Sequence, residues 1–221
     1  MNLIIIGPQA CGKGTQAEKL SNKYDLAHIE MGDILRSVAK QESLLGEKIK
    51  EYTNSGRLVP DEIIVEVLND RLQSLEKIDG FIFDGFPRII SQAEYLDKFL
   101  FEKSKKIDLV INLVLPRDVS IKRLMGRRTC SQCKKVYNLV TNPPKKEDQC
   151  DECGGKLVIR EDETMAVIET RLAVFEEQTK PVIEFYEKRG ILEKIDGTLS
   201  IEEIFSEINQ RLCKRGLTVC D

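Results

Sequence analysis

The sequence predicts an α/β protein with a parallel sheet flanked by helices, and three observations support this prediction. Short apolar runs of strand length alternate along the chain with longer segments whose apolar residues have helical spacing. The first apolar run leads directly into a glycine-rich loop and then into a helix. A chain of 221 residues also suits a single α/β domain that carries insertions.

The first predicted strand and helix enclose a phosphate-binding loop. Residues 3–6 form an apolar, β-branched run that is typical of a buried parallel strand. Residues 7–15 follow with the glycine and lysine spacing of a P-loop, in which backbone N–H groups and a helix N-terminus bind phosphate. Lys13 adds a point charge for phosphate oxygens. Gly14 follows the lysine, so the hydroxyl that usually contacts magnesium is displaced by one residue to Thr15.

The segment after the P-loop helix predicts one short strand and three helices. The strand contains the only histidine, His28, for which a packed structural role is favoured because nothing nearby in the sequence forms a triad with it. Residues 31–60 resemble an insertion between two core elements. The predicted elements are a strand at 26–29, a helix that opens at Gly32, a second helix at 47–52, and a long helix from Pro60 whose apolar spacing continues to Leu75.

A second apolar strand, residues 80–84, ends in an aspartate. The carboxyl ends of parallel strands form the ligand crevice in sheets of this kind. Asp84 is therefore placed to hold magnesium through water, and a turn aspartate before Gly85 is the alternative. Arg88 follows in a turn aimed at the same crevice, and Gln92 lies one helical turn further on.

The C-terminal half continues the alternation of strands and helices. Residues 108–115 predict a buried strand, and the next helix is expected to point Leu124 and Met125 inward. A long helix at 165–188 is expected to be disturbed at Pro181, which lacks a backbone N–H. The last predicted elements are a strand at 191–195 and an amphipathic helix with Ile201, Ile204, Phe205, Ile208 and Leu212 on its core face.

Four of the seven cysteines have the spacing of a metal site. Two residues separate Cys130 from Cys133 and Cys150 from Cys153, and sixteen residues lie between the two pairs. This spacing predicts a tetrahedral zinc site with a structural role, because four thiolates leave no open coordination position. Four reduced cysteines in a loop are the alternative. Cys11 lies inside the P-loop, where a small packed residue is favoured over a reactive thiol.

Composition and charge argue against several classes of protein. The formal net charge is −3 with 32% charged residues, which predicts a water-soluble protein without a global basic surface for nucleic acid. The apolar runs are of strand length, so no membrane span is predicted. No secretory signal is expected, and the predicted location is cytoplasmic.

Together these motifs resemble those of the adenylate kinase family over nearly the whole chain. Each motif is modest alone, but the set is specific in this order and at these distances. The four-cysteine segment further resembles the long form of the family. The residues that carry the resemblance are Gly7, Gly12, Lys13, Gly14 and Thr15; Gly32, Asp33, Leu35 and Arg36; Asp84, Gly85, Phe86, Pro87, Arg88 and Gln92; Gly126, Arg127 and Arg128; the four cysteines; Arg160 and Asp162; Arg171, Leu172, Gln178, Thr179 and Pro181; and Asp196 and Gly197.

The resemblance implies a P-loop nucleoside-kinase fold with a five-stranded parallel sheet. It also implies a cis peptide bond between Phe86 and Pro87 and a monomer as the default state. The implied division of the chain is a core of residues 1–30, 61–126 and 160–221, a helical monophosphate-binding lobe of residues 31–60, and a β-rich, zinc-bearing lid of residues 127–159.

The activity that the resemblance implies is reversible transfer of the terminal phosphate of Mg-ATP to AMP. The attacking phosphate oxygen is already anionic, so in-line positioning and charge neutralisation suffice. The implied catalytic residues are Lys13, Asp84, Arg88, Arg123, Arg160 and Arg171. The implied ATP-binding residues are Gly7, Gly12, Lys13, Gly14, Thr15, Arg123 near the phosphates, Arg127 against adenine, Tyr137 and Leu199. The implied monophosphate-binding residues are Met31, Gly32, Arg36, Arg57, Val59, Gly85, Arg88, Gln92, Arg160 and Arg171.

Three departures from the family pattern bear on the substrate. Met31 stands where the family usually has a hydroxyl near the base of the monophosphate, so we expect AMP to be accepted with weaker discrimination against UMP, CMP and GMP. Ala10 replaces a further loop glycine, and Glu163 replaces a second aspartate. The alternatives are a broad-specificity nucleoside monophosphate kinase and, with less support, a zinc-ribbon ATPase that binds nucleic acid.

Overall fold

The computed structural model describes residues 1–73, 75, 80–160 and 163–219. Its centre is a five-stranded parallel sheet, as predicted, with the strand order β2-β3-β1-β4-β8. All five residues of β1 are buried, which explains the continuous apolar run that begins the chain. The strands are β1 (Asn2–Ile6), β2 (Ala27–Glu30), β3 (Phe81–Asp84), β4 (Leu109–Val114) and β8 (Leu192–Asp196).

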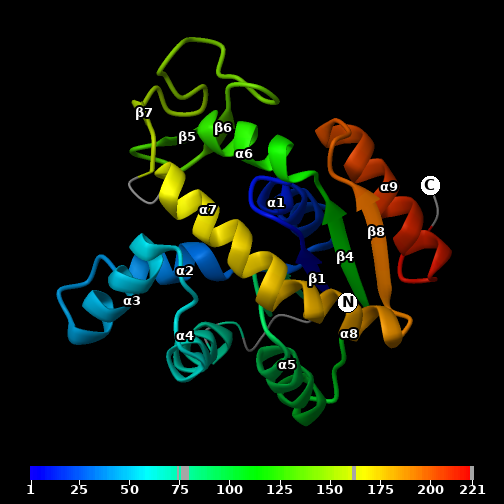
Figure 1. Ribbon diagram of the computed structural model, residues 1–221. Helices are drawn as coiled ribbons and strands as arrows, with labels where there is room; N and C mark the ends of the chain where they lie inside the picture. Colours follow the sequence, from blue (N-terminus) through cyan, green and yellow to red (C-terminus); the bar gives the residue numbers. More distant parts are fainter. Residues whose placement is uncertain (74, 76–79, 161–162, 220–221) are drawn as a thin grey trace.

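Helices cover both faces of this sheet (Figure 1). One face packs against α1 (Lys13–Tyr24) and α9 (Ile201–Lys214). The other face packs against the helices α2 (Met31–Val38), α4 (Asp61–Gln73), α5 (Ile90–Glu102) and α8 (Lys180–Lys188). Ile204, Ile208 and Leu212 are buried as predicted. A capping box starts α9, in which Ser200 and Glu203 each accept the other's backbone N–H.

The helical segment between β2 and β3 differs from its prediction at two places. The helix α3 (Leu44–Ser55) is longer than the predicted 47–52, because Ser43 caps it by accepting a hydrogen bond from the Gly46 N–H at 3.0 Å. The helix α4 ends at Gln73, so the prediction that Leu75 continues the helix is wrong, and Leu75 lies in a turn.

The long C-terminal helix contains one widened turn. The α7 helix (Met165–Val174) continues through a π-helical turn (Phe175–Thr179) into α8. The widened turn directly precedes Pro181, which cannot donate a backbone hydrogen bond, and this confirms the predicted disturbance. The prediction for Met125 is wrong: it is the last residue of α6 (Arg117–Met125) and is 59% exposed.

A small antiparallel sheet projects beyond one end of the main sheet, at the top of Figure 1. Its strands are β5 (Arg127–Cys130), β6 (Val136–Asn138) and β7 (Leu157–Val158), in the order β6-β5-β7. The buried hydrophobic cluster of this unit consists of Cys130, Tyr137, Cys150 and Leu157. In the part of the chain that the structure describes, no helix has the length and apolarity needed to cross a bilayer.

Candidate active site

The P-loop connects β1 to α1 and curls around the lysine side chain. Lys13 Nζ donates to the carbonyl oxygens of Gly7 at 2.9 Å and Pro8 at 2.7 Å. Gly7 has a φ of +154°, and a Cβ atom at this position would lie 2.5 Å from the Leu113 carbonyl oxygen. Only glycine therefore allows the loop to pass this close to β4.

Two further loop residues explain departures from the expected sequence. Ala10 has a φ of +58°, a left-handed conformation that glycine adopts without strain, which accounts for the family preference for glycine there. Cys11 is fully buried, and burial raises the pKa of its thiol. These observations support the packed, unreactive role expected for Cys11.

The carboxyl ends of β2 and β3 bring a histidine and two acids together beside the P-loop helix. Glu30 and Asp84 are partners in the β2–β3 register, and Asp84 is 5% exposed. His28 Nε2 lies 3.7 Å from Asp84 Oδ2. Burial acts to lower the pKa of His28, but the adjacent Asp84 carboxylate outweighs this effect and the pKa is raised. Burial, followed by the charges of Asp84 and Asp33, raises the pKa of Glu30 to about 7.

The turn after β3 positions a buried arginine. The Phe86–Pro87 bond is cis, as predicted. Arg88 Nε donates to the Gly85 carbonyl oxygen at 2.8 Å, and its backbone N–H donates to Gln92 Oε1 at 2.8 Å. Burial and then the nearby charge of Arg171 lower the pKa of Arg88 to about 10. Several positive charges therefore converge here with little solvent to screen them.

Three further arginines approach the same crevice from different elements. Arg36 of α2 pairs with Asp33 and Glu30. Arg171 of α7 reaches the helical segment of residues 31–60, where its Nη2 donates to the Thr53 carbonyl oxygen of α3 at 3.4 Å. Burial acts to raise the pKa of Asp33, but the charges of Arg36 and Arg160 outweigh it and the pKa is lowered. Arg160 thus lies close to the lobe that contains Asp33.

The remaining predicted site residues make the following contacts. Arg123 is buried, and its Nη1 donates to the Gly197 carbonyl oxygen at 2.8 Å, next to the half-buried Leu199. Arg127 forms an ion pair with the buried carboxylate of Glu163. The guanidinium of Arg57 is exposed and pairs with Glu51 on α3. Met31 and Val59 are buried in the hydrophobic core, and Gln92 Nε2 donates to Asp61 Oδ1 at 2.8 Å.

The four cysteine sulfur atoms lie within 4.8 Å of one another. The Sγ atoms of Cys130 and Cys153, and those of Cys133 and Cys150, are 3.5 Å apart. A tetrahedron with Zn–S bonds of about 2.3 Å has edges of about 3.8 Å, so the cluster fits a zinc ion. Tyr137 is buried against this cluster, and its hydroxyl lowers the pKa of Cys150 to about 6. Its side chain therefore belongs to the lid core.

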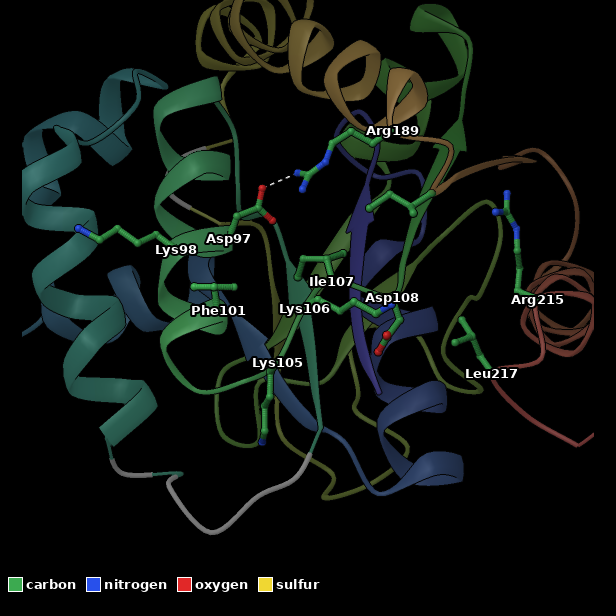
Figure 2. Close-up of a pocket in the computed structure, with 11 residues that line it drawn as sticks. Asp97, Lys98, Phe101, Lys105, Lys106, Ile107, Asp108, Arg189, Arg215 and Leu217 are labelled. Carbon is green, nitrogen blue, oxygen red and sulfur yellow. Dashed lines mark hydrogen bonds and ion pairs between the residues drawn. The ribbon is translucent and has the colours of Figure 1, made fainter.

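Two cavities lie at opposite ends of the sheet. A small one of about 60 Å³ is bounded by the P-loop, the turn at 85–88 and the widened turn that precedes α8. A larger groove of about 820 Å³ lies beside α5 and the residues that precede β4, where the amino end of that strand begins (Figure 2). Of these two, the small cavity is the one at the carboxyl ends of the strands, where ligands bind in parallel sheets.

The sequence predictions missed Glu30 and the contact between His28 and Asp84. His28 lies just before, and Glu30 just after, the last residue of the strand predicted at 26–29. The contacts of these two residues depend on β2 lying beside β3, and local sequence patterns do not specify that pairing. An acidic residue at the carboxyl end of a predicted parallel strand is the signal that points to Glu30.

These features define a class of protein. The first strand of the parallel sheet leads into a P-loop, and the neighbouring strand ends in an acid. Arginines from several elements converge on the same crevice. Together these features are typical of a P-loop nucleotide phosphotransferase. The convergence of positive charge on a phosphate-sized crevice is the feature that sets this class apart from P-loop switches, which also need a base-reading motif.

Comparison with known proteins identifies the family. The sequence profile of the adenylate kinase family matches residues 5–191. The adenylate kinase of Archaeoglobus fulgidus is 46% identical over 214 residues, which are 97% of this chain and 99% of that protein. The adenylate kinase of Carboxydothermus hydrogenoformans is 47% identical over 97% of this chain and 100% of that protein, and that of Syntrophomonas wolfei is 43% identical over 96% and 99%. The chain belongs to the adenylate kinase family, whose members are phosphotransferases that use Mg-ATP and AMP.

Proposed function

We propose that this chain transfers the terminal phosphate of Mg-ATP to AMP, reversibly, to give two molecules of ADP. The observation that carries the proposal is the convergence of Lys13, Arg36, Arg88 and Arg171 beside Asp84, at the carboxyl edge of the sheet. The experiment that tests it is the initial rate of ADP formation from Mg-ATP and AMP. No transfer to any nucleoside monophosphate would refute the proposal.

Each side of the crevice takes one nucleotide. The P-loop residues Gly7, Gly12, Lys13, Gly14 and Thr15 bind the phosphates of ATP together with Arg123. Arg127 lies against adenine, and Leu199 also belongs to the ATP site. The monophosphate binds to Gly32, Arg36, Arg57, Val59, Gly85, Arg88 and Gln92. Arg160 and Arg171 contact both phosphate groups. Guanidinium groups suit this task because they bind phosphate oxygens in pairs.

The chemistry needs no general base. A phosphate oxygen of AMP attacks the terminal phosphorus of ATP, and the arginines and Lys13 neutralise the charge that spreads over the transferring group. Asp84 would hold Mg²⁺ through water, and the ion would supply further charge neutralisation. The lobe of residues 31–60 and the lid of residues 127–159 exclude water when they close over the substrates, which suppresses hydrolysis of ATP.

The lid is a structural unit held by zinc. Its buried core contains two aromatic or aliphatic side chains, Tyr137 and Leu157, besides two of the cysteines. So small a core supports the proposal that the metal stabilises the lid and takes no part in phosphate transfer.

Base selectivity is proposed to be weaker than is usual in the family. Met31 is buried and brings no hydroxyl to the base. The Gln92 amide is already engaged by Asp61 and by the Arg88 backbone, so reading adenine would need these contacts to rearrange. A broad-specificity nucleoside monophosphate kinase is the alternative outcome.

Parallel rates with AMP, UMP, CMP and GMP decide between the two outcomes. Comparable rates with several bases would identify a broad-specificity enzyme, and Met31→Thr should then restore preference for AMP. A rate with AMP far above the others would show that Met31 does not loosen selection.

We also propose that the protein is a cytoplasmic monomer that does not bind nucleic acid. The net charge of −3 supports the last point. Light scattering during gel filtration tests the oligomeric state, and the salt dependence of any affinity for DNA or RNA tests nucleic-acid binding.

A further inference from the structure

The side chain of Arg36 is held by two carboxylates at the start of α2. Its Nη2 donates to Glu30 Oε1 at 3.2 Å, and its Nε donates to Asp33 Oδ1 at 3.0 Å. The side chains of Arg36 and Glu30 are 31% and 33% exposed. An arriving ligand can therefore reach both groups without any opening of the core.

The guanidinium reaches Glu30 because it folds back over a glycine. A Cβ atom at Gly32 would lie 3.1 Å from Arg36 Nη1, so a larger residue would push the guanidinium away. The guanidinium of Arg36 therefore stays near the N-terminus of α2. The helix dipole favours negatively charged groups at this position. In the structure those anions are Glu30, which precedes the helix, and Asp33 in its first turn.

Glu30 adds a negative charge at the place where a phosphate is proposed to bind. It is the β2 partner of Asp84 in the sheet register, and its Oε2 lies 4.0 Å from a Cβ built on Gly14 of the P-loop. Glu30 and Asp33 therefore both contact the guanidinium of Arg36. A phosphate group that pairs with Arg36 must displace the Glu30 carboxylate or accept its repulsion.

We propose that Glu30 is a further residue of the monophosphate site that sets its affinity, weakening nucleoside monophosphate binding by competing with the phosphate group for Arg36. The inference rests on the proposed function, in which Arg36 binds that phosphate. The competition acts on the phosphate and not on the base, so it affects AMP, UMP, CMP and GMP alike and leaves adenosine and ATP unaffected.

The decisive variant is Glu30→Gln, which removes the charge and keeps the size of the side chain. Its control is Glu42→Gln, which removes the same charge from an exposed position in the same lobe. We expect the KM and the equilibrium Kd for AMP to fall about fivefold, because Arg36 no longer has to give up its ion pair with Glu30 when it binds the phosphate, and a partly exposed ion pair is worth about a factor of five in binding. The KM for ATP, kcat and the affinity for adenosine should stay within twofold of wild type.

A double-mutant cycle tests whether the effect passes through Arg36. In an Arg36→Ala background, Glu30→Gln should change the Kd for AMP by less than twofold. A fivefold gain that persists without Arg36 would overturn the inference, because Glu30 would then act only through repulsion. Glu30→Ser serves as a second variant if Glu30→Gln does not fold, as judged by circular dichroism.

The failure of the inference is distinct from the failure of the proposed function. If the wild-type protein phosphorylates no monophosphate, the proposed function fails. If the wild type phosphorylates AMP but Glu30→Gln leaves the KM for AMP unchanged, the inference alone fails. A raised KM would also overturn it, since Glu30 would then position Arg36 for binding.

Discussion

The hydroxyl group of Tyr186 offers a direct test of the packing between α8 and α5. The side chain is 0% exposed, and its hydroxyl has no hydrogen-bond partner among the described residues. Burial also raises the pKa of this group well above its usual range. A buried hydroxyl without a partner costs about 1–3 kcal/mol. Tyr186→Phe keeps the ring and removes this cost, so the free energy of unfolding should rise by about 1 kcal/mol.

A second tyrosine on the same surface of the core provides the matched control. The hydroxyl of Tyr95 on α5 donates to Asn69 Oδ1 at 2.6 Å. Tyr95→Phe removes the same atom but breaks a hydrogen bond and leaves the amide oxygen unpaired. We expect this variant to lose about 1 kcal/mol of stability. The two substitutions are chemically identical, so the opposite signs depend on the partner and the burial of each hydroxyl.

Chemical denaturation in urea and calorimetry both measure these differences. For a protein of this size, about 1 kcal/mol corresponds to a shift of about 2–4 °C in Tm, upward for Tyr186→Phe and downward for Tyr95→Phe. A Tyr186→Phe variant that is less stable than wild type would refute the reasoning, because it would show that an ordered water or another group satisfies the hydroxyl.

Three further predictions follow from the sites. Removal of zinc by a chelator, or Cys150→Ser, should unfold the lid and leave the core folded, because two of the four side chains in the hydrophobic cluster of the lid belong to the cysteines proposed to hold the metal. Limited proteolysis should then cut within residues 127–159, and an uncut lid would contradict this. Gly7→Ala should destabilise the protein by about 3 kcal/mol and abolish phosphate transfer, because its Cβ would lie 2.5 Å from a carbonyl oxygen; unfolding curves and initial rates test both effects. Burial and the charges of Asp84 and Asp33 raise the pKa of Glu30 from 4.5 to about 7, because they outweigh the opposing charges of Arg36 and His28. Folding therefore disfavours the charged form of Glu30, and the stability of the protein falls as the pH rises from about 4.5 to about 7. Glu30→Gln should remove that dependence and add about 1 kcal/mol above pH 8, a figure reduced for partial exposure; unfolding curves at pH 5 and pH 8 check it, and equal gains at both pH values would contradict it.

Local sequence patterns were sufficient to predict the parallel sheet and the P-loop. A buried parallel strand is a short apolar run wherever it lies in the sheet, so β1, β3 and β4 were visible from composition alone. The cysteine spacing was equally sufficient, because a tetrahedral metal site imposes its own geometry on the chain. The position of Asp84 followed from a general property of parallel sheets and not from any detail of this one.

Side-chain orientation could not be obtained in the same way. Tyr137 lies in the lid between the two cysteine pairs, where either a ligand-facing or a buried ring is compatible with the sequence; the lid fold turns it toward Cys150. Met125 has the spacing of a core residue, but α6 ends there and the side chain projects into solvent. Both outcomes depend on which neighbouring element is present, and that is a property of the tertiary structure.

The acidic surroundings of Arg36 show why strand order matters for the chemistry of the site. Glu30 and Asp84 lie 54 positions apart in the sequence, and each ends a different strand. They become neighbours only because β2 pairs with β3 in a register that aligns their last residues. The same pairing places His28 against Asp84 and leaves Glu30 facing Arg36. The charge balance around the site proposed for the monophosphate therefore depends on a parallel pairing between distant segments.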